Sequence, residues 1–260
     1  MLDAGSKIIK QLSWSVSCSG SVIIVRHSWI RDLVRYGKRV ARAMRGLDLL
    51  PAVQVRCRRL RLGNDSGSWC ISPEDICCDS VVYSIGVGDD ISFDLELIRR
   101  FGLTVHAFDP TPRSREWLSH QSLPPQFVFH DIGIASFDGV ADFSMPERLD
   151  HVSFSMVRDS NATQIEIRVQ RLVTMVAELR HNRIDLLKMD IEGAEYGVID
   201  DILKSRIPIR QLLIEFHHRW PGIGIEKTRE AIRKLNAGGY AIFDVSASGE
   251  EYSFWRTNWP

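Results

Sequence analysis

The chain has 260 residues, of which 44% are hydrophobic, and its 33 basic side chains are balanced by 33 acidic ones. This composition excludes a disordered chain and predicts one large globular domain with an appendage. A formal net charge of zero excludes a global attraction to nucleic acid or to an anionic membrane, so any such preference needs a local patch.

The cysteines and the first residues indicate the compartment. The five cysteines are odd in number and contain no C-x-x-C motif, so neither a disulfide framework nor a zinc site is predicted. The stretch Gln11 to Val25 has a short apolar core with many serines and no basic region before it. It is therefore a poor membrane span and a poor signal peptide. We expect a soluble protein in a reducing, cytoplasmic setting.

Residues 1–61 are predicted to form a basic helical extension. Basic residues recur there near the helical period, and apolar residues fill the other side, which predicts an amphipathic helix. The favoured interpretation is a solvated face on a helix that packs against the main domain, and the alternative is a docking face for an anionic partner such as a membrane surface. The basic face consists of Arg31, Arg35, Lys38, Arg39, Arg42 and Arg45.

From Ser80 onward, short apolar runs alternate with amphipathic stretches, which is typical of an α/β fold with a parallel sheet covered by helices on both faces. The domain is assigned residues 62–260. Helices are expected after Asp90, at Pro112 and before Gly238. Residues 132–170 are expected to form a hairpin turned at Asp138 and Gly139, a polar loop and an alternating strand. Strands are predicted at 81–85, 104–108, 126–130, 185–190, 211–216, 240–245 and 251–255.

The last two predicted strands are joined only by SASGE, residues 246–250. This connection is too short for a crossover helix, so the two strands should pair antiparallel. A mostly parallel seven-stranded sheet with an antiparallel terminal strand is the arrangement expected of the Rossmann-like class I methyltransferases. A plain dinucleotide dehydrogenase would not end in this way.

A glycine turn follows the first strand of this sheet, in VVYSIGVGDD. Gly86 and Gly88 allow the backbone to approach a ligand closely, and Asp109 ends the next strand at the spacing expected of a ribose-binding carboxylate. The third glycine of the dinucleotide fingerprint is missing, and Asp89 and Asp90 would repel a pyrophosphate. The pattern favours a cofactor with a positive centre and no phosphate, such as S-adenosylmethionine. An ordinary tight turn is the alternative.

Four motifs carry a resemblance to a known family: YSIGVGDDISFD, HAFDPTP, IDLLKMDIEGAEY and QLLIEFHH. Together they resemble the FkbM family of S-adenosylmethionine-dependent methyltransferases, and the first is especially similar to its methyltransferase-like branch. The resemblance extends from about Leu62 to the C-terminus. It implies O-methylation of a hydroxyl on a small metabolite, sugar or glycan.

The resemblance also implies a cofactor site. Gly86 and Gly88 would line its methionine end, Asp109 would bind the ribose, and residues 131–133 would flank the adenine. Ser84 stands where many class I enzymes place an acid, so Asp89, Asp90 or Asp190 would have to receive the cofactor ammonium. The full expected set is Tyr83, Gly86, Gly88, Asp109, Pro110, Asp131, Ile132, Gly133 and Asp190.

The catalytic residues are predicted from the chemistry. Methyl transfer is an in-line displacement, so the protein aligns the acceptor oxygen and removes its proton. We expect His217, Glu192 and Asp190 to act here, with His217 as the first choice of base because imidazole can be neutral near pH 7. A hydrogen-bonded structural histidine is the alternative. Further candidates are His151, Glu195, Glu215 and His218, although Glu195 is assigned to the first turn of a helix.

Three alternatives stay open. No metal is predicted, yet Asp190, Glu192, Glu215 and His217 offer ligands for magnesium or manganese. The chain could also be a non-catalytic binding module that keeps the fold. A nicotinamide oxidoreductase is disfavoured by the missing glycine and the absence of a Tyr-x-x-x-Lys pair. The expected partner is a hydroxylated acceptor and not nucleic acid, and the oligomeric state is open.

Overall fold

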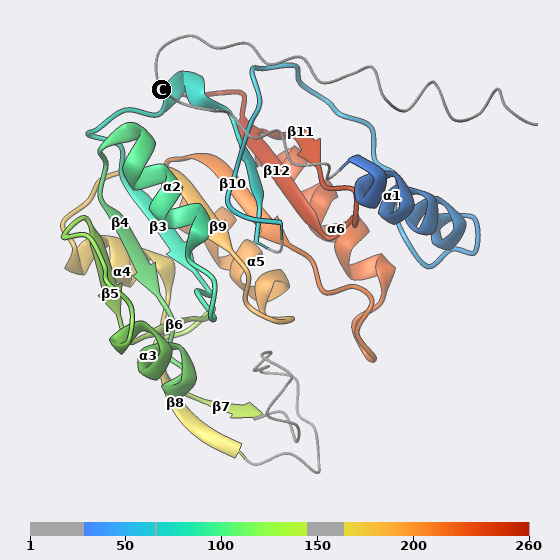
Figure 1. The fold of residues 1–260 in the computed structure, drawn as a ribbon. Coiled ribbons are helices and arrows are strands. Elements are labelled where there is room, and N and C mark those ends of the chain that lie inside the picture. Colours follow the sequence, from blue (N-terminus) through green and yellow to red (C-terminus); the bar gives the residue numbers. More distant parts are fainter. Residues whose placement is uncertain (1–28, 66, 145–163, 260) are drawn as a thin grey trace, which may run out of the picture.

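The computed structural model describes residues 29–65, 67–144 and 164–259, and its centre is a seven-stranded sheet (Figure 1). The strand order is β11-β12-β10-β9-β3-β4-β5, and only β12 runs antiparallel to its neighbours. The class I methyltransferase fold and the antiparallel pairing of the last two strands are therefore confirmed. The strands are β3 (Val82–Ile85), β4 (Val105–Phe108), β5 (Phe127–His130), β9 (Ile184–Met189), β10 (Ile209–Glu215), β11 (Tyr240–Val245) and β12 (Glu251–Arg256).

The two central strands are mostly apolar because helices cover both faces of the sheet, and the polar residues in them are Ser84, Asp185 and Lys188. Every residue of β3 and β9 is buried, as expected for strands inside a parallel sheet. Residues of α2 and α3 belong to one apolar core, and residues of α4, α5 and α6 belong to the other. The helices are α2 (Ser92–Phe101), α3 (Pro112–Ser119), α4 (Leu172–Glu178), α5 (Glu195–Ser205) and α6 (Ile225–Ala237).

Two helix starts follow the predicted capping chemistry. Asp90 Oδ1 accepts a hydrogen bond from Ser92 N at 2.9 Å, before α2. Thr111 is the N-cap of α3, where its hydroxyl accepts from Ser114 N at 3.3 Å and Pro112 takes the first helical position. Such contacts satisfy N–H groups that have no partner inside the helix. Both helices thus begin directly after the carboxyl ends of β3 and β4.

The insertion between β5 and α4 differs from the prediction. β6 (Gly133–Ile134) and β7 (Gly139–Ser144) do not form a hairpin, because β8 (Gln164–Gln170) lies between them and pairs with both. The physical reason lies at Asp138, which accepts hydrogen bonds from Arg171 N at 2.9 Å and from Thr174 Oγ1 at 3.0 Å. The presumed hairpin turn therefore supports the start of α4. The loop between β7 and β8, including His151, lies outside the described residues.

The N-terminal extension contains the predicted helix, α1 (Trp29–Ala43). Residues 48–62 then pack onto the sheet domain: Gln54 exchanges hydrogen bonds with the backbone of Ile242, and β1 (Leu60–Leu62) pairs antiparallel with β2 (Trp69–Ile71). A short 3-10 helix, η1 (Pro73–Asp75), follows. β1 therefore crosses the boundary predicted at residue 61. No helix within the described ranges is long and apolar enough to span a bilayer, and Gln11 to Val25 lies outside those ranges.

Candidate functional site

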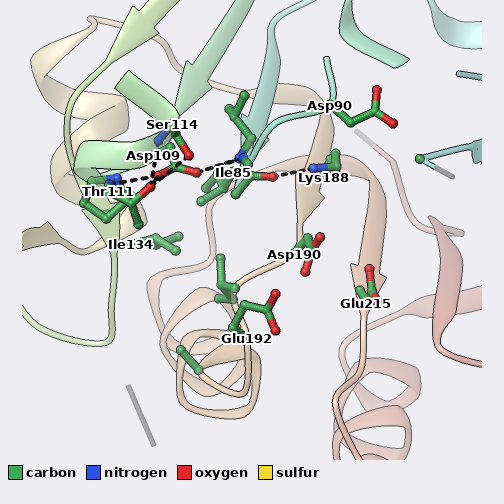
Figure 2. A pocket seen from close by; sticks show the side chains of 18 of the residues that line it. Ile85, Asp90, Asp109, Thr111, Ser114, Ile134, Lys188, Asp190, Glu192 and Glu215 are labelled. Atoms are coloured by element: carbon green, nitrogen blue, oxygen red, sulfur yellow. Dashed lines mark hydrogen bonds between the residues drawn. The ribbon is translucent and has the colours of Figure 1, made fainter. Parts of the chain in front are cut away.

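A cavity of about 310 Å³ opens at the carboxyl ends of β3, β4, β9 and β10 (Figure 2). This edge is where doubly wound sheets bind ligands, and the volume is within the range of small-molecule sites. The glycine turn and Asp109 lie at one end, and a group of carboxylates lies at the other. The predicted site residues that line the cavity are Gly86, Gly88, Asp109, Pro110, Gly133, Asp190 and Glu192.

The glycine turn is shaped by close backbone approach. Gly86 has a φ of +78°, and a Cβ atom placed there would lie 1.6 Å from the backbone oxygen of Asp190. Gly88 also has a positive φ, +58°, but a Cβ atom placed at this residue would have no neighbour within 4 Å. Gly86 is thus required by packing between β3 and β9, whereas Gly88 is required only by its backbone conformation.

Asp109 holds this turn in place. Its Oδ2 accepts hydrogen bonds from Val87 N and Gly88 N, each at 3.0 Å, and its Oδ1 accepts from Thr111 N at 2.9 Å and from the Thr111 hydroxyl at 2.6 Å. The side chain is buried yet lines the cavity. Asp109 therefore organises the cavity wall, and its predicted contact with a ribose stays a prediction.

Lys188 lies between the two ends of the cavity. Its ammonium donates to the Gly86 carbonyl at 2.7 Å and lies 5.4 Å from the centre of the Trp69 ring. β9 directs the Lys188 side chain toward the glycine turn. Lys188 therefore links β9 to the glycine turn that follows β3.

The carboxylate end of the cavity contains acidic groups with raised pKa values. Burial, together with the charge of Glu192, raises the pKa of Asp190 to about 6 despite the opposing charges of Lys188 and His217. Burial and the charge of Asp190 raise the pKa of Glu215 well above its usual range. Carboxylates that share a site resist simultaneous ionisation. Such perturbed groups in a cleft are typical of functional sites.

Glu192 takes an unusual backbone conformation. Its φ of +51° lies in the left-handed region, directly before Gly193 at +96°. An L-residue held there costs on the order of 1 kcal/mol. Strain of this kind is concentrated at functional sites. The turn places the Glu192 side chain on the cavity beside Asp190.

His217 lies behind these carboxylates and is not among the residues that line the cavity. Its Nε2 is 3.0 Å from Glu192 Oε2 and 3.6 Å from Asp190 Oδ1, and its side chain is 7% exposed. Burial alone would lower its pKa, but hydrogen bonds to Glu192 and Glu195 raise it to about 11. The raised pKa favours the imidazolium form of His217, which cannot accept a proton. The role of His217 as the base stays a prediction.

Glu195 begins α5, as predicted, and its side chain is fully buried. Its two oxygens accept hydrogen bonds from Gly193 N at 2.8 Å and His217 N at 2.9 Å. These bonds join the turn after β9 to the segment after β10. Glu195 thus has a structural role that also fixes the position of His217.

Three side chains offer a geometry that a metal ion could use. One ligand atom from each of Asp190, Glu192 and His217 lies within 4.8 Å of the other two. Two carboxylates and an imidazole suit manganese or another divalent ion.

Three predicted cofactor residues do not line the main cavity. Tyr83 is fully buried on β3, where it makes a 2.9 Å hydrogen bond to His181 Nδ1, and it lies further from the carboxyl end of the strand than Ile85, which does line the cavity. Asp131 and Ile132 line a separate cavity of about 220 Å³, and Asp131 pairs with Arg115. The cofactor contacts expected of these three residues stay predictions.

Several lining residues were not predicted. Gly67, Ser68 and Trp69 come from LGNDSGSW, residues 62–69, whose composition is typical of a simple connection, and Phe143 and Ile167 come from the insertion. The aromatic residue that ends LGNDSGSW is the one signal that distinguishes this stretch from a plain linker. Nothing in the local pattern shows that the stretch folds over the glycine turn.

The fold and the cavity define a class I methyltransferase domain. The model of the Methyltransferase FkbM domain family matches residues 80–242. Since this match covers more than half of the chain, the chain belongs to the FkbM methyltransferase family, and the resemblance found in the sequence is confirmed.

Two curated relatives are similar. The chain is 27% identical over 209 residues to the probable methyltransferase-like protein 24 of Rattus norvegicus and 26% identical over 209 residues to that of Homo sapiens. Each alignment covers 73% of this chain and 51% of the relative. The chain thus spans about half the length of these relatives.

Two solved structures are more distant. A methyltransferase FkbM from Methylobacillus flagellatus is 15% identical, with a TM-score of 0.41, over 70% of this chain and 44% of that one. Aeropyrum pernix fibrillarin, solved with natively bound S-adenosyl-L-methionine, is 12% identical, with a TM-score of 0.37, over 80% of this chain and 86% of that one. The fold assignment therefore depends on the strand order described above.

Proposed function

We propose that the chain transfers a methyl group from S-adenosylmethionine to a hydroxyl of a small metabolite, sugar or glycan. The charge of the cavity is the observation that carries this proposal. Seven carboxylates line it, against one ammonium, that of Lys188. Such a lining repels a pyrophosphate and attracts a cofactor with a sulfonium and an ammonium group. The acids are Asp89, Asp90, Asp109, Asp190, Glu192, Glu215 and Glu251.

The same lining supplies substitutes for the missing acid of the first motif. Ser84 is fully buried and does not line the cavity. Asp89, Asp90 and Asp190 do line it, so each is available to receive the cofactor ammonium. When bound, S-adenosylmethionine supplies the methyl group at its sulfonium. The residues of this chain then have to hold the acceptor in line and remove its proton.

We assign proton removal to Asp190 and a supporting role to His217. A general base is most effective when its pKa is near the working pH. Asp190 meets this condition with a pKa of about 6, and it lines the cavity. The charge of His217 opposes the rise in the pKa of Asp190 and so favours its ionised form. Glu192 would then hold the acceptor hydroxyl beside Asp190.

Calorimetry tests cofactor choice. We expect S-adenosylmethionine to bind to the purified chain and NADH to give no heat. The reverse result would overturn the proposal in favour of an oxidoreductase. A mass-spectrometric screen of hydroxylated metabolites and glycans with labelled S-adenosylmethionine would then identify the acceptor. Cofactor binding without transfer to any hydroxyl would favour the binding module.

A further inference from the structure

Helix α1 exposes an apolar surface that the methyltransferase domain does not cover. In the part of the chain that the structure describes, ten large hydrophobic side chains are exposed, and eight of them lie between residues 30 and 53. Leu33 is 63% exposed and Met44 is 79% exposed. Ile30, Leu33, Val34 and Tyr36 lie on α1, and Met44, Leu47, Leu50 and Val53 follow it in the chain. We call these eight residues, with the cations among them, the α1 face.

The apolar side of α1 is exposed because the helix is attached through a polar side chain. Arg39 is buried, and it donates to the Leu49 carbonyl at 2.9 Å and to the Ser246 carbonyl at 3.1 Å. A surface helix ordinarily buries its apolar stripe and solvates its charges. Among the residues of α1 whose burial is described, only Arg39 is buried, whereas Leu33 and Val34 are exposed. The interpretation of α1 as a helix with only a solvated basic face therefore does not account for the exposed apolar residues.

Cations lie beside these apolar residues. Arg35, Lys38 and Arg45 are exposed and Arg42 is half-buried, and none of the four has an ion pair with a described residue. Of the acids nearby, Asp65 pairs with Arg31 and Asp48 is buried against Arg219, which leaves the single charge of Asp32 on α1 against the four cations. The α1 face thus combines exposed apolar surface with uncompensated positive charge. Contiguous exposed apolar surface on a soluble domain usually marks an interaction site.

We infer that the α1 face docks on an anionic lipid surface. Amphipathic helices with lysine and arginine bind there by burying apolar side chains at the acyl boundary while their cations meet lipid phosphates and carboxylates. A second copy of the chain fits less well, because pairing two α1 faces would bring two sets of unpaired cations together. Nucleic acid would match the charge but would leave the apolar side chains in water.

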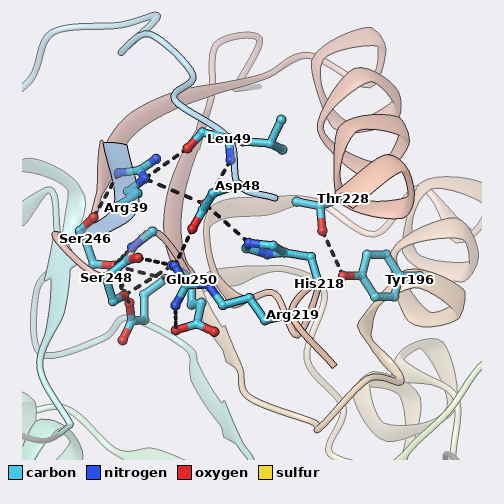
Figure 3. A network of polar contacts seen from close by, with 12 residues as sticks. Arg39, Asp48, Leu49, Tyr196, His218, Arg219, Thr228, Ser246, Ser248 and Glu250 are labelled. Atoms are coloured by element: carbon cyan, nitrogen blue, oxygen red, sulfur yellow. Dashed lines mark hydrogen bonds and ion pairs between the residues drawn. The ribbon is translucent and has the colours of Figure 1, made fainter. Parts of the chain in front are cut away.

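The docking helix is fixed firmly to the half of the domain that bears the carboxylates. The Asp48 carboxylate, which is inaccessible to solvent, pairs with Arg219 and lies 3.3 Å from His218 Nε2, and Arg219 also pairs with Glu250 (Figure 3). His218 and Arg219 directly follow His217. An ion-pair network of this kind resists displacement of the helix. Docking through the α1 face would therefore hold the whole domain at the surface.

Vesicle cosedimentation tests this inference. The probes are vesicles of phosphatidylcholine alone and of phosphatidylcholine mixed with phosphatidylserine. We expect the chain to bind only the mixed vesicles and to bind more weakly as salt is added. The double variant Arg35→Glu with Lys38→Glu should lose roughly tenfold or more in affinity. Leu33→Ser with Met44→Ser should lose a similar factor, since apolar burial contributes too.

The control is Arg229→Glu with Arg233→Glu on α6, which changes the net charge equally on exposed arginines elsewhere. This variant should sediment like the parent chain, and circular dichroism should show that all variants are folded. Equal losses in the α1 and α6 variants, or no binding by the parent chain, would overturn the inference. A different outcome would be a parent chain that is dimeric and binds no vesicles, together with a monomeric double variant Leu33→Ser with Met44→Ser. That result would assign the α1 face to a second copy of the chain instead. Cofactor binding tests the proposed function separately.

Discussion

The two ends of the cavity are built by different means. At the glycine turn, both oxygens of Asp109 accept hydrogen bonds from neighbouring donors. At the other end, Asp190 Oδ1 is buried without a hydrogen bond to a described residue, and the pKa values of Asp190 and Glu215 are raised. A satisfied network specifies a rigid shape, whereas an unsatisfied one is costly in the absence of a partner. We therefore assign cofactor binding to the turn and chemistry to the carboxylates.

The largest effect is expected for Asp190→Asn, which should lower turnover far more than cofactor affinity. Asp190→Asn keeps the shape of the side chain but removes the base, so turnover should fall by about 10²- to 10⁴-fold. Cofactor affinity should change much less, because the glycine turn is intact. Single-turnover methyl transfer and calorimetry measure the two quantities. Glu251→Gln, at the cavity edge on β12, is the matched control and should retain most of the activity. Normal turnover in Asp190→Asn would remove Asp190 from the mechanism.

A backbone substitution tests the rigid end. Gly86→Ala places a Cβ atom against the Asp190 carbonyl, and such a clash should lower the free energy of unfolding by about 3 kcal/mol or more. Gly88→Ala also needs a left-handed conformation but meets no atom within 4 Å, so its cost should be about 1 to 2 kcal/mol. Urea unfolding measures both. Equal costs would mean that the strands adjust and that close approach does not fix the turn.

The fold was predictable because its signals are local and repeated. Each strand of the large sheet is an apolar run, and SASGE is too short to allow anything but an antiparallel pair. The insertion was predicted less well, since the Asp138–Gly139 pattern that indicates a hairpin serves here to start α4. A dipeptide does not reveal which distant N–H group its carboxylate will bind.

Several residues of the site were predictable from the sequence, but their charge states were not. The acids after β9 were identified from their place at the strand end, and they do line the cavity. The charge state of His217 depends on Glu195 and Glu192, which reach it only through the turn that follows β9. A pKa set by three-dimensional neighbours cannot be derived from the spacing of residues along the chain.

Asp109 tests whether the turn and the cofactor are coupled. Asp109→Ala removes two hydrogen bonds from the glycine turn and two from Thr111, so cofactor affinity should fall by roughly 1.5 to 3 kcal/mol, the range for hydrogen bonds to a charged group. Asp131→Ala, in the separate cavity, should leave affinity unchanged. Calorimetry with S-adenosylmethionine measures the cofactor affinity of both variants. Equal losses would return Asp131 to the cofactor site, and an unchanged constant for Asp109→Ala would refute its assignment.

The acidity of Asp190 predicts a pH profile. A base works only when deprotonated, so kcat/KM should be constant above its pKa of about 6 and should fall about tenfold for each pH unit below it. Rates measured from pH 4.5 to 8, in buffers of constant ionic strength, test this. A limb at the ordinary carboxylate pKa of about 4 would show that Asp190 is not the base. Circular dichroism at each pH would separate catalysis from unfolding.

Chelation of divalent ions should have the smallest effect on turnover, and it tests whether the carboxylate end of the cavity uses a metal while the glycine turn does not. If the imidazolium of His217 supplies the positive charge beside Asp190 and Glu192, removal of divalent ions should leave turnover within about twofold. If instead EDTA abolishes turnover and Mn²⁺ restores it, the three side chains form a metal centre. His217 would then be a neutral ligand, and activation of the acceptor would pass from Asp190 to the ion. Loss of the Mn²⁺ response in Glu192→Gln, with cofactor affinity retained, would locate that centre at the carboxylate end, because the glycine turn offers no imidazole.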